Sequence, residues 1–186
     1  MKLETERLIL RPFCEDDAAD VFAYLAEPTV NCFACMKQES VESTRRDLIE
    51  RAKRGGECYA IVLKAENKVI GEIEAHAESA APGPGAVMDT YSPCWMLNPA
   101  YQGKGYAFEA AQAFFEHLFS TCGARRIYAY TEDYNLPSQH LCEKLGMRRE
   151  GIFMEFVSFV NKPDGTPLYE NTMQYAILKH EWEARA

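Results

Sequence analysis

The sequence predicts a single α/β domain of 186 residues. Short apolar runs typical of strands alternate along the chain with segments of helical periodicity. One such run, Cys94–Leu97, precedes a turn with two glycines and then a long helical pattern at residues 107–119. Hydrophobic residues make up 47% of the chain, which is enough for a folded core. Together these observations favour one folded unit, or at most a tight pair of lobes, over a disordered chain.

Turn and cap signals delimit the elements in the first third of the chain. Pro12 ends the strand predicted at residues 8–10, because proline cannot donate to a sheet ladder. Asp16 or Asp17 can cap the next helix, whose apolar stripe lies at helical spacing between residues 18 and 25. The remaining predictions here are a loop at residues 29–40 and a charged helix at 41–54 that ends at Gly55-Gly56.

Three strands and a long helix are predicted in the middle of the chain, at residues 58–63, 69–77, 87–98 and 107–119. A mobile loop rich in glycine and proline precedes the third strand at residues 80–86. Pro93 interrupts this third strand, so the strand either contains a bulge or lies at a sheet edge. The helix gathers alanine, phenylalanine and leucine side chains on one face, which we expect to be core.

The last third of the chain predicts one strand, one helix and a terminal hairpin. The strand lies at residues 127–130, and the helix at 138–145 is closed by Gly146 as its C-cap. Two further strands, at 153–160 and 170–178, flank the turn-forming segment Asn161–Pro167 and form the antiparallel hairpin. No internal repeat or linker interrupts the sequence, which agrees with one domain over residues 1–186.

Charge and hydropathy exclude several classes of function. The formal net charge is −8, which argues against nucleic acid as a partner because such proteins need a positive surface. No apolar run approaches the roughly 18 residues of a membrane span, and charges occupy the place of a signal peptide's apolar region. We therefore expect a cytoplasmic protein without a membrane partner. The acidic field would attract a cationic substrate, although it also serves solubility.

The seven cysteines are scattered, and two of them, Cys32 and Cys35, form a single C-x-x-C. A structural zinc site usually needs a second close pair of cysteines or histidines, which the sequence does not provide. We expect reduced, mostly buried thiols and no metal, with a redox role for the C-x-x-C as the alternative. His140 and Cys142 lie two residues apart on a predicted helix and cannot face each other, so a cysteine nucleophile is rejected.

The segment from Asn98 to Ala107 has the features of an anion-binding turn. Its two glycines let a ligand approach the backbone, and free N–H groups at the start of the next helix favour phosphate. A P-loop does not fit, because Lys104 lies between the glycines and Tyr106 follows. A dinucleotide fingerprint does not fit either, because Phe108 fills its third glycine position.

Three segments carry a resemblance to a known family. Gln102–Ala107 has the pattern Gln-x-x-Gly-x-Ala and resembles the pyrophosphate loop of the GNAT superfamily, the acetyl-CoA-dependent N-acetyltransferases. Asn135–Gly151 resembles the family's second CoA-side segment, and Leu3–Phe13 resembles the opening strand of the ribosomal-protein N-terminal (alanine/serine) acetyltransferase branch. The three segments occur in family order, and with their connecting elements they cover nearly the whole chain.

The resemblance implies a GNAT fold, in which a mixed, mostly antiparallel central sheet is splayed at its middle strands and flanked by helices. It implies acetyl-CoA as co-substrate and no metal. By the same resemblance, the thioester and pantetheine meet the strand backbone at Met96 and Leu97, and Asn135 meets the pantetheine arm. The pyrophosphate is then bound by the loop residues Gln102, Gly103, Lys104, Gly105, Tyr106 and Ala107.

The catalytic residues match the family pattern less well. Many members carry a tyrosine that protonates the leaving thiolate, and Cys142 occupies that position here. In the ribosomal-protein branch a serine at the position of Ser138 contacts the CoA sulfur, so Ser138 is the candidate acid, with a helix N-cap as its alternative role. One family base position aligns with Ser92 and another with Tyr130, which makes Tyr130 the second catalytic candidate.

The resemblance implies that the acceptor is a primary amine that attacks the thioester directly, with no acyl-enzyme. A protein N-terminal α-amine suits a site without an evident strong base, because its pKa is lower than that of lysine. The acidic charge favours the alternative, a small cationic amine such as a polyamine or aminoglycoside. A non-catalytic acyl-CoA-binding module, and an interaction protein that only keeps the fold, remain further alternatives. The protein is expected to be a monomer or homodimer.

Overall fold

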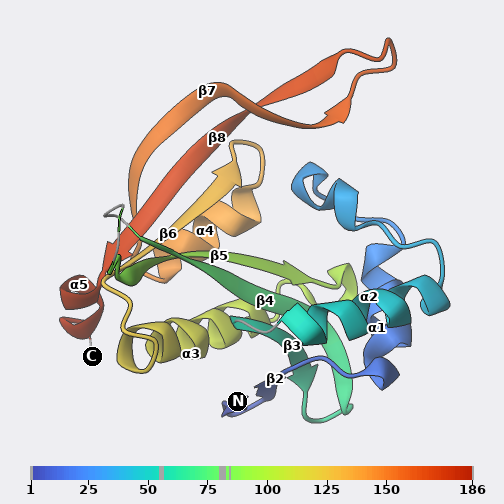
Figure 1. The fold of residues 1–186 in the computed structure, drawn as a ribbon, viewed down its shortest axis with the longest axis horizontal. Helices are drawn as coiled ribbons and strands as arrows, with labels where there is room; N and C mark the ends of the chain where they lie inside the picture. The colour runs from blue at the N-terminus through green and yellow to red at the C-terminus, as the bar shows by residue number, and fades with distance from the viewer. Residues whose placement is uncertain (1, 55–56, 80–82, 84, 186) are drawn as a thin grey trace. The chain divides into compact units, whose positions relative to one another are not determined.

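The structure is a computed structural model that describes residues 2–54, 57–79, 83 and 85–185. Its strands are β1 (Leu3–Glu4), β2 (Leu8–Arg11), β3 (Glu57–Leu63), β4 (Lys68–Ser79), β5 (Met88–Leu97), β6 (Arg126–Glu132), β7 (Arg148–Asn161) and β8 (Pro167–Leu178). Its α-helices are α1 (Ala18–Leu25), α2 (Val41–Arg54), α3 (Tyr106–Ser120), α4 (Leu136–Lys144) and α5 (Lys179–Glu183). Three 3-10 segments complete the elements of the described residues: η1 (Glu15–Asp17), η2 (Asn31–Met36) and η3 (Pro99–Tyr101) (Figure 1).

The strands form one open mixed sheet in the order β1-β2-β3-β4-β5-β6-β8-β7. The registers of β1–β2, β2–β3, β3–β4, β6–β8 and β8–β7 are antiparallel, whereas β5 and β6 run parallel. β5 therefore lies inside the sheet, so of the two alternatives for Pro93 the edge strand was wrong. The parallel register joins Thr90 to Arg126 and Tyr91 to Ile127, before Pro93 is reached.

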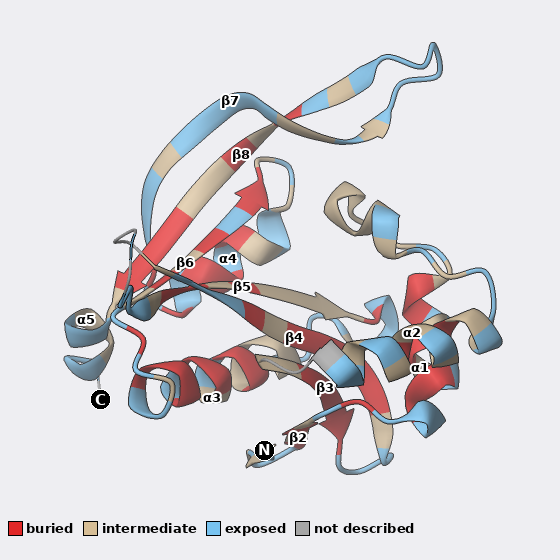
Figure 2. Cartoon of the chain, in the orientation of Figure 1, coloured by how far each residue is buried: buried red, intermediate tan, exposed pale blue. Residues whose placement is uncertain are grey.

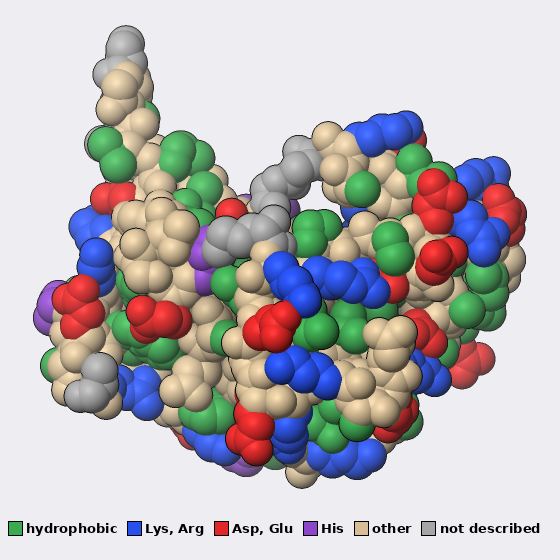
Figure 3. Space-filling view, turned by 90° about the horizontal axis from the view of Figure 1, so that it is seen from below, with side chains coloured by type: hydrophobic (Ala, Val, Ile, Leu, Met, Phe, Trp, Pro, Cys, Tyr) green, Lys and Arg blue, Asp and Glu red, His purple; other side chains and the backbone are tan. Residues whose placement is uncertain are grey.

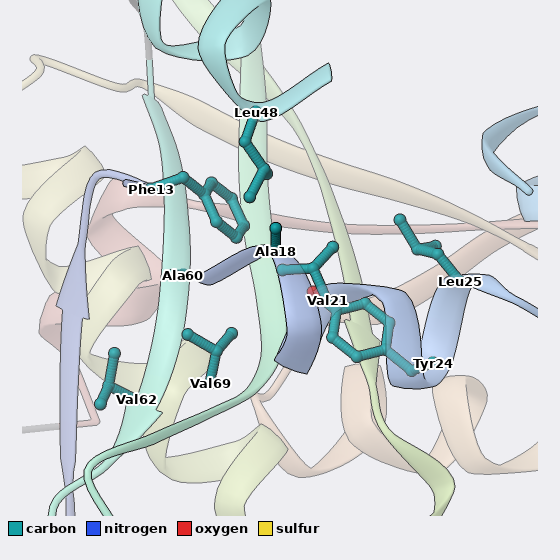
Figure 4. Close-up of a cluster of buried hydrophobic side chains, with 9 residues drawn as sticks. All are labelled: Phe13, Ala18, Val21, Tyr24, Leu25, Leu48, Ala60, Val62 and Val69. Carbon is teal, nitrogen blue, oxygen red and sulfur yellow. The ribbon is translucent and has the colours of Figure 1, made fainter. Parts of the chain in front are cut away.

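The chain divides into two compact units. The first contains residues 1–75 and 94–113, and the second contains residues 76–93 and 114–186. In the first unit, α1 and α2 pack their apolar faces on the strands around β3. The core cluster formed there consists of Phe13, Ala18, Val21, Tyr24, Leu25, Leu48, Ala60, Val62 and Val69 (Figure 4). This burial gives the first unit a core of its own.

In the second unit, β6 and β7 pair on either side of β8, and α4 follows β6. Trp182 of α5 packs against Phe115 and Phe119 of α3, with ring centroids 5.8 Å apart in each pair. β7 forms the last strand of the sheet, and most of its residues are exposed, including several large apolar ones (Figure 2). The expected apolar face of the long helix is core, because Phe114, Phe115 and Leu118 are fully buried.

Several local expectations need correction. The loop at residues 29–40 contains the 3-10 segment η2, and the short strand β1 precedes the predicted opening strand. Asp17 does not cap α1 with its side chain; its carboxylate instead accepts hydrogen bonds from Arg11 and from the N–H of Cys14. The helix stop at Gly55-Gly56 and residues 80–82 and 84 of the predicted loop lie outside the described residues.

Two further expectations concern the burial of the cysteines and the absence of a membrane-spanning segment. All seven cysteines are described as reduced thiols, but Cys142 alone is buried, whereas Cys14 and Cys35 are exposed. The expectation of mostly buried thiols was therefore wrong. No helix in the described part of the chain is both long enough and apolar enough to span a membrane.

Candidate active site

The turn between β5 and α3 in the first unit is shaped by one asparagine and two glycines. The Asn98 side chain accepts a hydrogen bond from the N–H of Ala100 at 3.0 Å and so starts η3. Gly103 and Gly105 then adopt φ values of +73° and +82°, which few residues other than glycine adopt readily. The first hydrogen bond of α3 runs from the Glu109 N–H to the Gly105 carbonyl at 3.1 Å.

The main-chain N–H groups of this turn are available to a ligand. Within the described residues, no protein atom accepts a hydrogen bond from the N–H groups of Gly103, Lys104, Gly105, Tyr106 or Ala107. Gly103, Lys104 and Gly105 are also exposed. These donors sit at the positive end of the α3 dipole, a combination that binds anionic oxygens. The turn therefore offers a set of N–H donors to an anion, and the binding of a pyrophosphate there stays a prediction.

Two side chains of the turn are directed at the protein rather than outward. The Gln102 amide donates to the Leu97 carbonyl at 3.3 Å. The Lys104 ammonium donates to the Ala100 carbonyl at 3.1 Å and lies 5.2 Å from the centroid of the Tyr101 ring. Their predicted contribution to ligand binding stays a prediction. What the structure assigns to both side chains is a role in holding the turn.

Arg7 is a residue of the turn that the sequence argument missed. Its guanidinium donates to the Lys104 carbonyl at 3.0 Å and lies 4.6 Å from the centroid of the Tyr106 ring. Glu109 fixes Arg7 by accepting from its Nε at 2.6 Å and from its N–H at 2.8 Å. Arg7 thus places a cation beside the free N–H groups. The resembling segment Leu3–Phe13 contained the residue, but no spacing rule linked it to a turn about 100 positions away.

The ionisation of Glu109 stabilises the contact between Arg7 and the turn. Partial burial disfavours its charged form, but hydrogen bonds from Thr5, the Arg7 N–H and the Arg7 guanidinium outweigh that effect. Together they lower the pKa of Glu109 below its usual value of 4.5. The carboxylate is therefore ionised at neutral pH and keeps Arg7 against the turn.

The backbone at Met96 and Leu97 approaches β4 unusually closely. A Cβ atom placed on Gly71 would lie 2.6 Å from Leu97 Cδ2, 2.9 Å from Leu97 Cα, and closer still to the Met96 carbonyl oxygen. One residue earlier, the Ile70 carbonyl accepts from the Asn98 N–H at 2.9 Å. A strand glycine at such a point marks a close approach of two backbones. Gly71 therefore sets the position of the segment predicted to meet the thioester.

In the second unit, Asn135 and Ser138 lie together at the start of α4. Asn135 is the N-cap: its side-chain oxygen accepts from the Ser138 N–H at 3.3 Å, and its amide donates to Glu132 at 3.4 Å. The helix starts at Leu136 rather than at the predicted Ser138, so the alternative role of Ser138 as N-cap was wrong. Among the described residues, nothing hydrogen-bonds to the Ser138 hydroxyl.

These contacts separate the effects of two substitutions on stability. We expect Asn135→Ala to lower the free energy of unfolding by about 1 kcal/mol, because it removes the cap of α4. Ser138→Ala should leave that free energy within about 0.5 kcal/mol of the wild type, because the hydroxyl has no partner to lose. Urea unfolding of the two variants measures the difference. A larger loss for Ser138→Ala than for Asn135→Ala would contradict the assignment.

Tyr130 and Cys142 have very different surroundings in the second unit. Tyr130 is exposed, accepts a hydrogen bond from Gln174 at 3.3 Å and packs near Tyr128, Phe153 and Phe156. Cys142, which occupies the family's tyrosine position, is fully buried, and burial raises the pKa of its thiol to about 12. Cys142 therefore does not replace the missing acid.

Two buried carboxylates, Glu72 and Glu132, also differ in their surroundings. Glu72 accepts hydrogen bonds from Arg51 at 2.6 Å and from Tyr24 at 2.9 Å in the first unit, so it belongs to a buried ion pair. Glu132 lies at the end of β6 beside Asn135. The structure thus brings Met96, Leu97 and residues 102–107 together in one unit, and Glu132, Asn135 and Ser138 together in the other.

A family model described as the acetyltransferase (GNAT) domain matches residues 7–148 of the chain. The chain belongs to the GNAT acetyltransferase family. Its GNAT domain is similar over 182 residues to the uncharacterized N-acetyltransferase YnaD of Bacillus subtilis (strain 168), at 31% identity, covering 98% of this chain and 99% of that protein. A shorter match of 90 residues, also at 31% identity, relates it to spermidine N(1)-acetyltransferase of Escherichia coli (strain K12), covering 48% of this chain and 45% of that protein.

Solved structures agree with this assignment. The crystal structure of a GNAT-family acetyltransferase from Bacillus anthracis has a TM-score of 0.80 at 31% identity, over 97% of this chain and 99% of the other. That of ribosomal-protein-S5-alanine acetyltransferase from Vibrio fischeri has a TM-score of 0.73 at 18% identity, over 98% of each chain, which shows the fold alone. The GNAT domain is an N-acetyltransferase, and the expected fold and family are confirmed.

Proposed function

We propose that this protein binds acetyl-CoA with its pyrophosphate on the main-chain N–H groups of Gly103–Ala107 and transfers the acetyl group to a primary amine. The observation that carries the proposal is the set of free donors at the start of α3, beside the Arg7 guanidinium. GNAT acetyltransferases use acetyl-CoA as co-substrate. The exposed turn and the positive end of the helix supply what a diphosphate requires without a metal.

The transfer proceeds in one displacement. The neutral amine attacks the thioester carbon, the new C–N bond forms, the C–S bond breaks, and CoA leaves as a thiolate that takes up a proton. We assign the donation of that proton to Ser138, whose hydroxyl is unengaged within the described residues and takes up a replacement proton from water as it donates its own. Tyr130, oriented by Gln174, stands at the family's base position and would relay the amine's proton, because its hydroxyl oxygen accepts that proton while its own O–H proton passes to water. Such proton transfers contribute typically about 10²–10⁴-fold in rate.

For the acceptor we propose the α-amine at a protein N-terminus. An α-amine with a pKa of about 7.8 is neutral in about one molecule in seven at pH 7, whereas a lysine amine with a pKa of about 10.4 is neutral in about one in 2,500. Glu72 is not available as a strong base for a lysine amine, because Arg51 and Tyr24 engage its carboxylate. The likeness in fold to the ribosomal-protein-S5-alanine enzyme is consistent with this class of acceptor.

A small cationic amine is the second candidate. The partial match to the spermidine enzyme supports it, as does the net charge of −8. On the face shown in Figure 3, acidic and basic side chains are interspersed, so the acidic excess does not form one continuous surface there. A local site rather than the global field would then have to select such an amine.

Two measurements test this proposal in sequence. Acetyl-CoA should raise the melting temperature, because it binds the folded protein. Thiol release should then follow when peptides with free N-termini are added. Turnover of polyamines with no turnover of peptides would show that the acceptor is a small cationic amine and not a protein N-terminus. Binding of acetyl-CoA without thiol release over both panels would favour a non-catalytic acyl-CoA-binding module.

A matched pair of glycine variants tests the turn itself. Gly103→Ala and Gly165→Ala each place a Cβ at a positive φ, +73° and +85°, where nothing lies within 4 Å. Both should therefore lose similar stability, of roughly 1–2 kcal/mol. We expect Gly103→Ala to weaken acetyl-CoA binding about tenfold or more, because it distorts the donor turn, while Gly165→Ala in the β7–β8 turn keeps wild-type affinity. Isothermal titration calorimetry measures both affinities, and equal affinities would argue against the turn as the CoA site.

Seven reduced cysteines are typical of a protein in a reducing compartment, so we place this reaction in the cytoplasm as part of the same proposal.

A further inference from the structure

One face of the three strands β6, β8 and β7 in the second unit carries a row of chemically distinctive side chains. Glu132 on β6 lies directly opposite Thr172 on β8, and Thr172 lies opposite Phe153 on β7. Directly opposed residues share a face, as do residues two apart on one strand. Glu170 and Tyr130 therefore belong to the same face, and we call Tyr130, Glu132, Phe153, Glu170 and Thr172 the Glu132 cluster.

The three polar members of the Glu132 cluster are buried, and two of them, Glu132 and Thr172, are not fully satisfied. Glu132, Glu170 and Thr172 are 4%, 7% and 4% exposed. Within the described residues, the Thr172 hydroxyl has no hydrogen-bond partner. Among the same described residues, the Glu132 carboxylate accepts one hydrogen bond, from the Asn135 amide at 3.4 Å, and no cation pairs with it. A buried carboxylate without a counter-charge and a buried hydroxyl without a partner are both unfavourable. Both retain the capacity to accept a hydrogen bond from a cationic donor.

The surroundings of these groups suit a cation rather than a neutral ligand. Glu170, which accepts hydrogen bonds from the Tyr134 hydroxyl at 3.3 Å, lies diagonally across from Glu132, and such diagonal pairs are about 7–8 Å apart, with their Cβ atoms somewhat closer. The two aromatic members of the cluster, Tyr130 and Phe153, have exposed rings whose centroids are 6.2 Å apart. Aromatic faces attract ammonium groups, so the carboxylates and the rings of the cluster both favour the binding of a cation.

We propose that the Glu132 cluster binds a primary ammonium group of the acceptor, and that this group is not the one acetylated. The inference rests on the proposed function. Carboxylates beside an amine stabilise its protonated form, and a protonated amine has no lone pair with which to attack a thioester. The acceptor must then carry a second amine, which reacts. Asn135, whose amide donates to Glu132, is itself the residue that we expect to meet the pantetheine arm.

The shared chemistry of such acceptors is a reacting amine linked to a second, charged amine. A diamine or polyamine has this chemistry, and so does a peptide whose lysine follows its N-terminal residue. Both candidate acceptors, the small amine and the peptide, must therefore carry a second, charged amine beside the one that reacts. The net charge of −8 fits it, because a doubly charged acceptor gains more from an acidic protein than a singly charged one.

The test compares acceptors with one and two amines. Butane-1,4-diamine is compared with butylamine, and a peptide beginning Ala-Lys with one beginning Ala-Gln. We expect the wild type to prefer the diamine, the Ala-Lys peptide, or both in kcat/KM. Glu132→Gln should reduce that preference about tenfold or more, as expected for losing a charge-assisted hydrogen bond. Glu183→Gln, which removes an exposed charge on α5, is the matched control and should keep it.

A second measurement does not depend on acetyl transfer. Calorimetric titration of butane-1,4-diamine, without acetyl-CoA, should show binding that both Glu132→Gln and Thr172→Val weaken and Glu183→Gln preserves. Binding with this pattern but without thiol release would support the cluster and contradict the enzyme proposal. Turnover without a preference for the second amine, or a preference that Glu132→Gln leaves unchanged, would overturn the cluster and leave the enzyme proposal standing.

Discussion

Replacing Arg51 with methionine is expected to lower the free energy of unfolding by about 3–5 kcal/mol. Arg51 and Glu72 form an ion pair at 2.6 Å in which the two side chains are 9% and 5% exposed. Burial disfavours the charged guanidinium, but the Glu72 carboxylate outweighs it and raises the pKa of Arg51. Methionine would fill much of the volume beside Phe13 and leave Glu72 charged in the core without its partner.

Urea unfolding of three variants checks this result. Lys53→Met, on the same helix, breaks an ion pair whose side chains are 66% and 61% exposed, and should change stability by less than about 1 kcal/mol. The double variant Arg51→Met/Glu72→Leu should be more stable than Arg51→Met alone, because no buried charge remains. Equal losses for Arg51→Met and Lys53→Met would show that the pair contributes no more than a surface contact.

Gly71→Ala is expected to damage both stability and acetyl-CoA binding. The added Cβ would meet the Met96 carbonyl and the Leu97 Cα, which are backbone atoms that no rotamer change can move away. Overpacking of this kind typically destabilises by about 1–3 kcal/mol. To relieve it, β5 must move away from β4 at the segment that we expect to meet the thioester. We therefore predict a lower melting temperature together with a weaker affinity for acetyl-CoA.

Gly151→Ala is the matched control for this strand glycine. Gly151 lies in β7, also without a positive φ, and a Cβ there meets nothing within 4 Å. This variant should keep or slightly raise the melting temperature and should not change the calorimetric affinity for acetyl-CoA. If Gly71→Ala matched Gly151→Ala in both measurements, the close approach of β4 and β5 would have no role in placing the ligand.

Local sequence signals were sufficient to predict the elements that are long and regular. The periodicity of residues 41–54 and 107–119 predicted α2 and α3 within one residue at each end. The Gln-x-x-Gly-x-Ala pattern and its two glycines predicted the turn before α3, where both glycines have positive φ. These features depend on residues close together in the sequence, which is why periodicity and turn chemistry reveal them.

Features that depend on strand register could not be predicted in this way. Glu132 faces Thr172 across 40 positions, and Glu109 holds Arg7 across 102. Neither pairing leaves a local pattern, because register is set by the whole sheet. The role of Asp17 was missed for the same reason: its partner Arg11 lies on the preceding strand, and an ion pair replaced the expected helix cap.

The central claim is that a diphosphate binds the free N–H groups of Gly103–Ala107. Amide resonances of ¹⁵N-labelled protein, recorded with CoA and with pantetheine, test it most directly, since pantetheine lacks the pyrophosphate. We predict large shifts for the amides of residues 103–107 with CoA and small ones with pantetheine. If CoA bound while these five amides stayed unperturbed, or if pantetheine shifted them equally, the account of this site would be contradicted.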